Sequence, residues 1–214
     1  MTGNNIKIIP SFHGVGAGIR FQNIVQADLD RCALSKAACG GLYGVQAVPR
    51  KNKAHDPEDP DSRPVVFQPI KSLPDFEGVL DGGRQFMFDC KVVSGASLPL
   101  SKYDMDRGER RRQLNHMLTR SRFKAICGFM IHFNARKSER IDDLAVTYLF
   151  PVIHDHTFWT RFDAGIKRTI NREDCEQIAI RVCWPVRNGS LMPDVLGAVT
   201  SLARVVDAKS YSRQ

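Results

Sequence analysis

The stretch LPDFEGVLDGGRQFMFDCKV, residues 73–92, predicts two short strands joined by a tight turn. Its apolar runs flank Gly82-Gly83, and paired glycines in this position are typical of a β-hairpin. Side chains alternate between the two faces of a strand, so Asp89 and Lys91 are expected on the same face. The hairpin then brings Asp75 alongside Asp89. Two carboxylates and an ammonium are therefore predicted to converge at one end of a sheet.

Helices and further strands are expected on both sides of this hairpin. The expected helices cover residues 19–37, 104–120 and 193–207. The expected strands cover residues 42–49, 64–70, 76–80, 84–93, 123–133, 144–152 and 177–184. Gly40-Gly41 is predicted to stop the first helix. This order predicts an α/β fold with a mixed central sheet flanked by helices.

The length and composition are those of a protein with one large core. The 214 residues are 43% apolar, which supports a single domain rather than a disordered chain. No run approaches the roughly 18 apolar residues that cross a bilayer, and the polar start MTGNNIK lacks the apolar region of a secretory signal. We therefore expect an intracellular protein without a membrane partner. The six cysteines form no CxxC pair, which favours reduced thiols over disulfides or zinc.

Two acids and a lysine inside an apolar segment carry charges that are costly to bury unless they are neutralised. A divalent metal between the carboxylates neutralises them, and Mg²⁺ prefers oxygen ligands while it keeps several waters. Phosphodiester hydrolysis uses such a set, because a metal and a lysine stabilise the charge that develops on the phosphoryl group. The alternative is an ordinary Asp89–Lys91 ion pair on the surface of an edge strand, with Asp75 in a turn.

The residues Pro74, Asp75, Asp89 and Lys91 resemble the PD-(D/E)xK signature of nucleases with restriction-endonuclease-like folds. In a wider context, the chain resembles the RecU family of Holliday junction resolvases. Four stretches carry this resemblance: VFQPIKSLPDFEGVLDGGRQFMFDCKV, RRQLNHM, KAICGFMIHF and TYLFPVIHDHTFW. The resemblance covers roughly residues 16–160 and implies a single nuclease domain over residues 1–214, with a C-terminal extension from about residue 165. It also implies a DNA endonuclease that resolves four-way junctions as a homodimer, with Mg²⁺, or Mn²⁺ in its place.

The resemblance assigns roles to four positions. Asp75 and Asp89 match the metal ligands, and Lys91 matches the catalytic lysine. Gln113 stands where the family carries a helix glutamine near the active site. Asp89 occupies a position where the family usually has glutamate, a change that the wider signature permits.

The first helix departs from the family pattern. These nucleases usually present a glutamate from that helix to the metal, whereas this chain reads GIRFQ, with Gln22 at that position. An amide is a weaker Mg²⁺ ligand than a carboxylate. We expect Glu77, two residues after Asp75 on the same strand face, to supply the missing charge. The alternative is that Glu77 faces solvent.

Basic residues indicate how DNA is held. The net charge is +8 and the isoelectric point is near 9.4, which makes a polyanion a plausible partner. One expected contact group lies between residues 107 and 124: Arg107, Arg110, Arg111, Arg112, Arg120, Arg122 and Lys124. The loop at residues 50–63 lies where the family has a stalk that enters the junction, and its base carries Arg50, Lys51 and Lys53. Two alternatives stay open: a restriction-like or repair endonuclease on duplex or flapped DNA, and a DNA-binding protein with an impaired metal site.

Overall fold

The computed structural model describes residues 9–34, 38–42, 74–103, 108–135 and 144–211. Several sequence predictions therefore lie outside the described residues. They are the strand at 42–49 apart from Leu42, the strand at 64–70, the loop at 50–63 and the basic residues Arg50, Lys51, Lys53 and Arg107.

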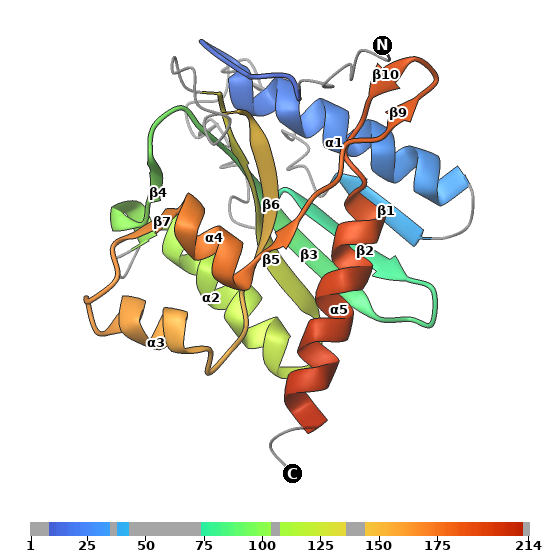
Figure 1. Cartoon of the computed structure of the whole chain (residues 1–214). Coiled ribbons are helices and arrows are strands. Elements are labelled where there is room, and N and C mark those ends of the chain that lie inside the picture. Colours follow the sequence, from blue (N-terminus) through green and yellow to red (C-terminus); the bar gives the residue numbers. More distant parts are fainter. Residues whose placement is uncertain (1–8, 35–37, 43–73, 104–107, 136–143, 212–214) are drawn as a thin grey trace, which may run out of the picture.

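A mixed six-stranded sheet forms the centre of the structure (Figure 1). Its strands, in order across the sheet, are β1 (Ala38–Leu42), β2 (Phe76–Leu80), β3 (Gln85–Val93), β5 (Ile126–Phe133), β6 (Val146–Pro151) and β8 (Ile180–Arg181). Neighbouring strands are antiparallel except for β3 and β5, which are parallel. The predicted α/β class with a mixed central sheet is confirmed.

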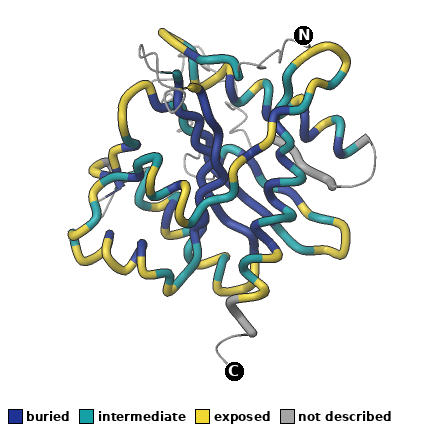
Figure 2. Tube along the Cα trace, viewed as in Figure 1, coloured by how far each residue is buried: buried dark blue, intermediate teal, exposed yellow. Residues whose placement is uncertain are grey.

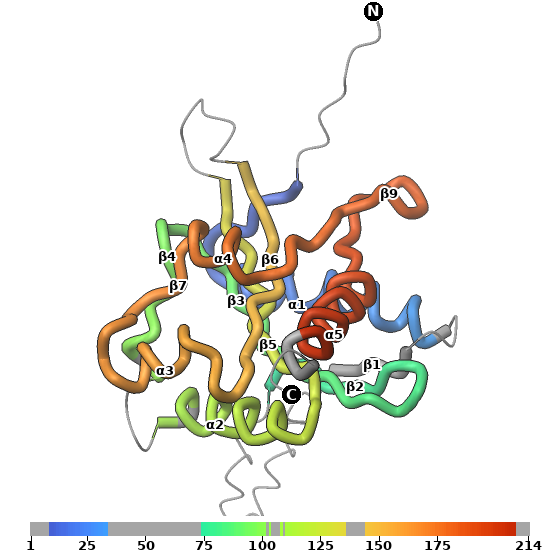
Figure 3. Tube along the Cα trace, turned by 60° about the horizontal axis from the view of Figure 1, so that its bottom comes forward, coloured from blue at the N-terminus to red at the C-terminus, as the bar shows by residue number. Residues whose placement is uncertain are grey.

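Helices cover both faces of this sheet. They are α1 (Ala17–Leu34), α2 (Glu109–Arg122), α3 (Thr157–Asp163), α4 (Arg172–Ile178) and α5 (Val195–Tyr211), with a 3-10 turn, η1 (Ser101–Tyr103). Two small two-stranded sheets pair β4 (Ser97–Pro99) with β7 (Thr169–Asn171), and β9 (Val186–Arg187) with β10 (Ser190–Leu191). Helices α2, α3 and α4 pack on one face, and α1 and α5 pack on the other (Figure 3). Helix α2 lies in the connection between the parallel strands β3 and β5.

The alternation of side chains along β3 divides the core into two clusters. Phe86, Phe88 and Cys90 join the cluster under α1 and α5, whereas Met87 joins the cluster under α2. The inner strands are buried along most of their length (Figure 2). Odd-numbered residues of β3, which include Asp89, therefore belong to the α2 face.

The glycine turn of the β2–β3 hairpin has the geometry that the sequence predicts. Gly82 and Gly83 have φ angles of +90° and +83°, which residues with a side chain rarely adopt. The backbone amide of Leu80 donates to the carbonyl of Arg84 at 2.8 Å. Phe76 lies opposite Phe88, and this register sets Asp75 level with Asp89.

Three sequence predictions need correction. The first helix ends at Leu34, and Gly40-Gly41 lies inside β1, because pairing with β2 places Gly40 opposite Gly78. Only residues 180–181 of the expected strand at 177–184 enter the sheet, because α4 occupies the residues before them. The capping box formed by Asn171 and Asp174 is the sequence signal that would have predicted the start of α4. Helix α3 was not predicted either.

Helices α1 and α5 are joined by a buried carboxylate. Asp28 of α1 is fully buried and accepts hydrogen bonds from Arg187 at 2.8 Å and from the backbone amide of Val195 at 3.0 Å. Arg31 is its third partner, at 3.0 Å. The scaffold of this sheet face is therefore fixed by a satisfied ionic network.

The remaining composition-based expectations concern cysteines and the membrane. Cys32, Cys90, Cys127 and Cys175 are buried, Cys183 is exposed, and these five are reduced thiols, as predicted. Within the described ranges, no helix has the length and apolarity of a membrane span.

Candidate active site

Asp89 is a buried carboxylate on an inner strand. It is 1% exposed, and β3 lies between β2 and β5. The ammonium of Lys91, two residues further along the same face, forms an ion pair with Asp89 Oδ2. Asp89 Oδ1 has no hydrogen-bond partner among the described residues. The ion pair of the alternative interpretation is therefore present, but it lies on an inner strand and not at the surface of an edge strand.

Asp75 is fixed against the same strand from across the hairpin. It directly precedes β2, and its Oδ2 accepts a hydrogen bond from the backbone amide of Cys90 at 2.8 Å. This contact places its carboxylate level with Asp89 across the hairpin, where it raises the pKa of Asp89. The structure therefore brings together Asp75, Asp89 and Lys91, which we call the acidic cluster.

Burial dominates the electrostatics of the acidic cluster. Burial raises the pKa of Asp89 to about 7; the charge of Lys91 opposes this shift, and Asp75 adds to it by hydrogen bonding and repulsion. The pKa of Lys91 is raised to about 12: burial lowers it, but the charge of Asp89 and further contributions from Tyr103 and Asp75 outweigh that effect. Close to neutral pH, a second negative charge on the two carboxylates is therefore unfavourable, and a cation between them would offset it.

Tyr103 is a member of this region that the sequence analysis missed. It ends η1, is fully buried, and its hydroxyl has no hydrogen-bond partner among the described residues. Its ring packs edge-on against Phe129 with 5.5 Å between centroids, and Phe129 is the register partner of Asp89 on β5. Burial raises the pKa of Tyr103 to about 12. The charge of Lys91 acts to lower this pKa, and the charge of Asp89 acts to raise it. The stretch SLPLSKY offers no pattern that would have indicated this placement.

Three other predicted site residues lie on β2, α1 and α2. Glu77 shares the sheet face of Asp75, as predicted, but its carboxylate accepts a hydrogen bond from Gln85 further towards the turn. Gln22 lies on α1, the helix that packs on the opposite face of the sheet. Gln113 is half-buried on α2, the helix that covers the face of the acidic cluster. Glu77 and Gln22 are therefore not brought to Asp75 and Asp89 as a third ligand.

The donor set of the acidic cluster fits Mg²⁺ rather than a softer metal. The described part of the chain holds no group of three or more His, Cys, Asp or Glu side chains arranged for a metal ion. Two carboxylates are nonetheless a usual protein contribution to a Mg²⁺ site, because this ion keeps several of its waters. The unsatisfied, buried Oδ1 of Asp89 is an acceptor for which a hard cation is a suitable partner. Asp75 and Asp89 are the residues that would hold it.

The predicted DNA-contacting residues on and after α2 are half-buried or exposed. Arg110 and Arg111 are half-buried, and four others are exposed: Arg112, Arg120, Arg122 and Lys124. Arg111 forms an ion pair with Asp163 at 2.8 Å, and Arg122 hydrogen bonds to His154. The charge of Arg110 acts to lower the pKa of Tyr103, against the effect of burial.

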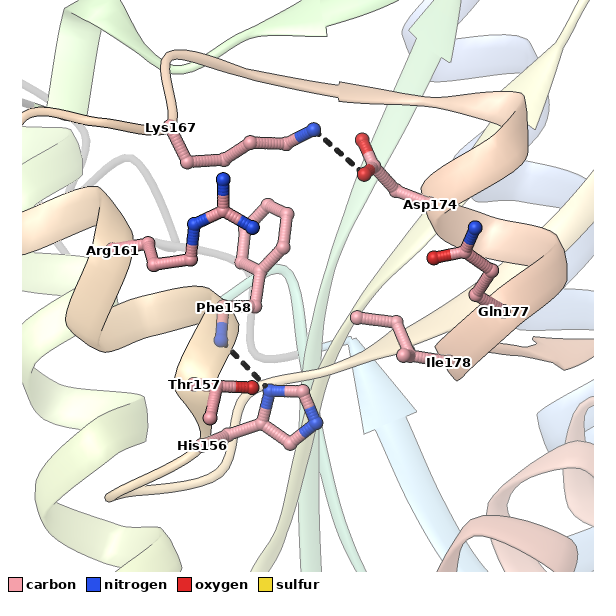
Figure 4. A pocket seen from close by; sticks show the side chains of 8 residues that line it. All are labelled: His156, Thr157, Phe158, Arg161, Lys167, Asp174, Gln177 and Ile178. Carbon is pink, nitrogen blue, oxygen red and sulfur yellow. Dashed lines mark hydrogen bonds and ion pairs between the residues drawn. The ribbon is translucent and has the colours of Figure 1, made fainter.

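A separate pocket of about 130 Å³ lies between α3 and α4 (Figure 4). Lys167 and Asp174 face one another across it and form an ion pair at 2.6 Å, while Phe158 lies beneath Lys167. Asp174 also accepts from the backbone amide of Asn171 at 2.9 Å, as part of the α4 capping box. The ion pair between Lys167 and Asp174 links the segment after α3 to the first turn of α4, so these two charges contribute to the packing of the pocket walls.

Comparison with known protein families and with curated proteins finds no family model and no curated protein that matches this chain.

The charges around Asp89 predict the direction in which substitutions move its pKa. Asp75→Asn removes a repulsive neighbour and is expected to lower the pKa of Asp89 below 7. Lys91→Met removes the favourable charge and is expected to raise it. Carboxyl chemical shifts followed by NMR over a pH series measure both changes in metal-free protein.

The same titration has a consequence for stability. The folded protein holds a proton on Asp89 that the unfolded chain releases, so this carboxyl makes stability fall as pH rises from about 4 to about 7.

An Asp89 pKa near the ordinary value of an aspartate in the wild type, unmoved by either substitution, would contradict the buried, coupled arrangement.

Proposed function

We propose that this protein is a Mg²⁺-dependent structure-selective DNA endonuclease of the RecU-like kind, which resolves four-way junctions by paired phosphodiester hydrolysis. One observation carries the proposal. Asp89 is buried on β3 beside Lys91 and level with Asp75 at the start of β2, and its Oδ1 has no hydrogen-bond partner among the described residues. A mixed sheet with a hairpin, a helical crossover and a parallel strand agrees with a restriction-endonuclease-like fold.

Each residue of the acidic cluster has a distinct task in this proposal. Asp75 and Asp89 hold the cation, and the backbone amide of Cys90 fixes the direction of Asp75. When bound, Mg²⁺ supplies Lewis-acid polarisation of the scissile phosphate. Lys91 stays protonated at neutral pH and donates to a phosphate oxygen, where it stabilises developing negative charge. The apolar core around Asp89 limits access of water to the carboxylate and strengthens each of these charge interactions.

Helix α2 is the proposed contact surface for the DNA backbone. It covers the sheet face that carries the acidic cluster, and its Arg112 and Arg120 side chains are exposed. Arginine binds phosphate through several donors, which gives affinity and orientation without reading sequence. A homodimer is part of the proposal because two symmetric cuts require two such sites related by a two-fold axis.

A second candidate is DNA binding without cleavage. It is favoured by one observation: among the described residues, neither Gln22 nor Glu77 completes a third ligand at Asp75 and Asp89. A nuclease acting on duplex or flapped DNA is the third possibility, with the same site and a different substrate.

Cleavage assays with matched substrates separate these candidates. A labelled four-way junction and a linear duplex of the same sequence are incubated with Mg²⁺ or Mn²⁺, for wild type and Lys91→Ala. We expect symmetric cuts in the junction alone, with a loss of rate of roughly a hundredfold or more in Lys91→Ala, since this variant lacks a charge at the developing phosphoryl anion. Junction binding without cuts by wild type supports the binding protein, and equal cutting of both substrates supports the duplex or flap nuclease.

The contact surface makes its own prediction about salt. Arg120→Gln on α2 is expected to weaken junction binding and to reduce the slope of log K against log salt by about 0.9 for each phosphate that the protein no longer neutralises. Arg204→Gln is the matched control, because Arg204 is an exposed arginine of α5 on the opposite face of the sheet. Fluorescence anisotropy at several salt concentrations gives both slopes. Equal slopes for the two variants would place the DNA elsewhere.

A further inference from the structure

The hydroxyl of Tyr103 is a buried polar group that the packing of the fold does not require. It is fully buried and has no hydrogen-bond partner among the described residues. An unsatisfied buried hydroxyl destabilises a protein, so each case in a native structure needs an explanation. Phenylalanine would fill the same space without this cost.

The surroundings of Tyr103 provide that explanation. Its ring packs on Phe129, which lies beside Asp89 in the sheet, and η1 contacts α2 on the face of the acidic cluster. After burial, the charge of Lys91 has the largest effect on the pKa of Tyr103. Tyr103 in turn contributes to the pKa of Lys91. The hydroxyl and the ammonium therefore belong to the same face of the sheet, and each lies within range of the other's charge.

Lys91 needs a second partner if Asp89 is to bind a cation. In the structure its ammonium forms an ion pair with Asp89 Oδ2. A carboxylate that coordinates a cation is a poorer acceptor for an ammonium, and two positive charges in a buried space repel each other. Within the described residues of this sheet face, Tyr103 offers an unused acceptor oxygen for the displaced ammonium.

We propose that Tyr103 is a positioning residue for Lys91. Its hydroxyl oxygen accepts a hydrogen bond from Lys91 Nζ when the ammonium leaves Asp89, and this contact both frees Asp89 for the cation and aims Lys91 at the substrate. The inference rests on the proposed function of the acidic cluster as a Mg²⁺ site. It adds a residue that neither the PD-(D/E)xK signature nor the resemblance assigns.

The test is Mg²⁺ binding measured by calorimetry at about pH 8, without DNA. Tyr103→Phe removes only the hydroxyl, and we expect Mg²⁺ affinity to fall by about tenfold, the effect of one hydrogen bond to a charged group. Denaturant unfolding is expected to show equal or greater stability, because the unsatisfied group is gone. Tyr148→Phe is the matched control: Tyr148 is a buried tyrosine of the same core cluster, on β6, and removal of its hydroxyl is expected to leave Mg²⁺ affinity unchanged.

A double-mutant cycle isolates the action through Lys91. Lys91→Met removes the ammonium, so Tyr103→Phe is expected to have no further effect on Mg²⁺ affinity in that background. In cleavage assays, Tyr103→Phe is expected to lower kcat with little change in KM for DNA, because the variant keeps every side chain that binds the DNA backbone.

The outcomes distinguish the inference from the function on which it rests. Wild-type affinity in Tyr103→Phe would overturn the inference while leaving the Mg²⁺ site intact. An equal loss in Tyr103→Phe with and without Lys91 would also overturn it, because Tyr103 would then act by another route. Absence of Mg²⁺ binding in the wild type would overturn the Mg²⁺ site and the inference together.

Discussion

The placement of a carboxylate on an inner strand constrains the rest of this structure. Asp89 is 1% exposed, and an isolated ionised group in that position would be very costly. The cost is limited by Lys91 on the same strand face, whereas Asp75 across the hairpin, held by the amide of Cys90, adds a repulsive charge. A slip of one residue in the β2–β3 register would destroy this arrangement, because every side chain would move to the opposite face. The glycine turn and the Phe76–Phe88 pair therefore fix the chemistry as well as the fold.

The two faces of the sheet have different tasks. One face carries the acidic cluster under α2, whose outer surface is rich in arginine. The other face is covered by α1 and α5, which Asp28 holds together through charged and backbone partners. Substitutions that alter function are expected on the first face, and substitutions that alter stability on the second. The α3–α4 pocket lies on the first face, but its ion pair serves the packing of those helices.

The sequence predicted the parts of the site that depend on local pattern. Alternation along β3 and the paired glycines were enough to place Asp75, Asp89 and Lys91 together, and to place Glu77 on the same face. The sequence did not show the depth of burial, because β3 becomes an inner strand only through its parallel pairing with β5, which is distant in the chain. The same long-range pairing hid Tyr103, while Gln22 was expected near the site but lies on the helix of the opposite face. Tertiary pairing also overrode the apparent helix stop at Gly40-Gly41, which became part of β1.

The most direct test of the account is the number of protons released when Mg²⁺ binds. Calorimetry in buffers of different ionisation enthalpy measures it at about pH 6 and about pH 9. Asp89 has a pKa of about 7, so the account predicts release of nearly one proton at the lower pH, almost none at the higher pH, and none at either pH in Asp89→Asn. Mg²⁺ binding that releases no proton at the lower pH, or that is unchanged by Asp89→Asn, would contradict the claim that this buried carboxylate is where the cation binds.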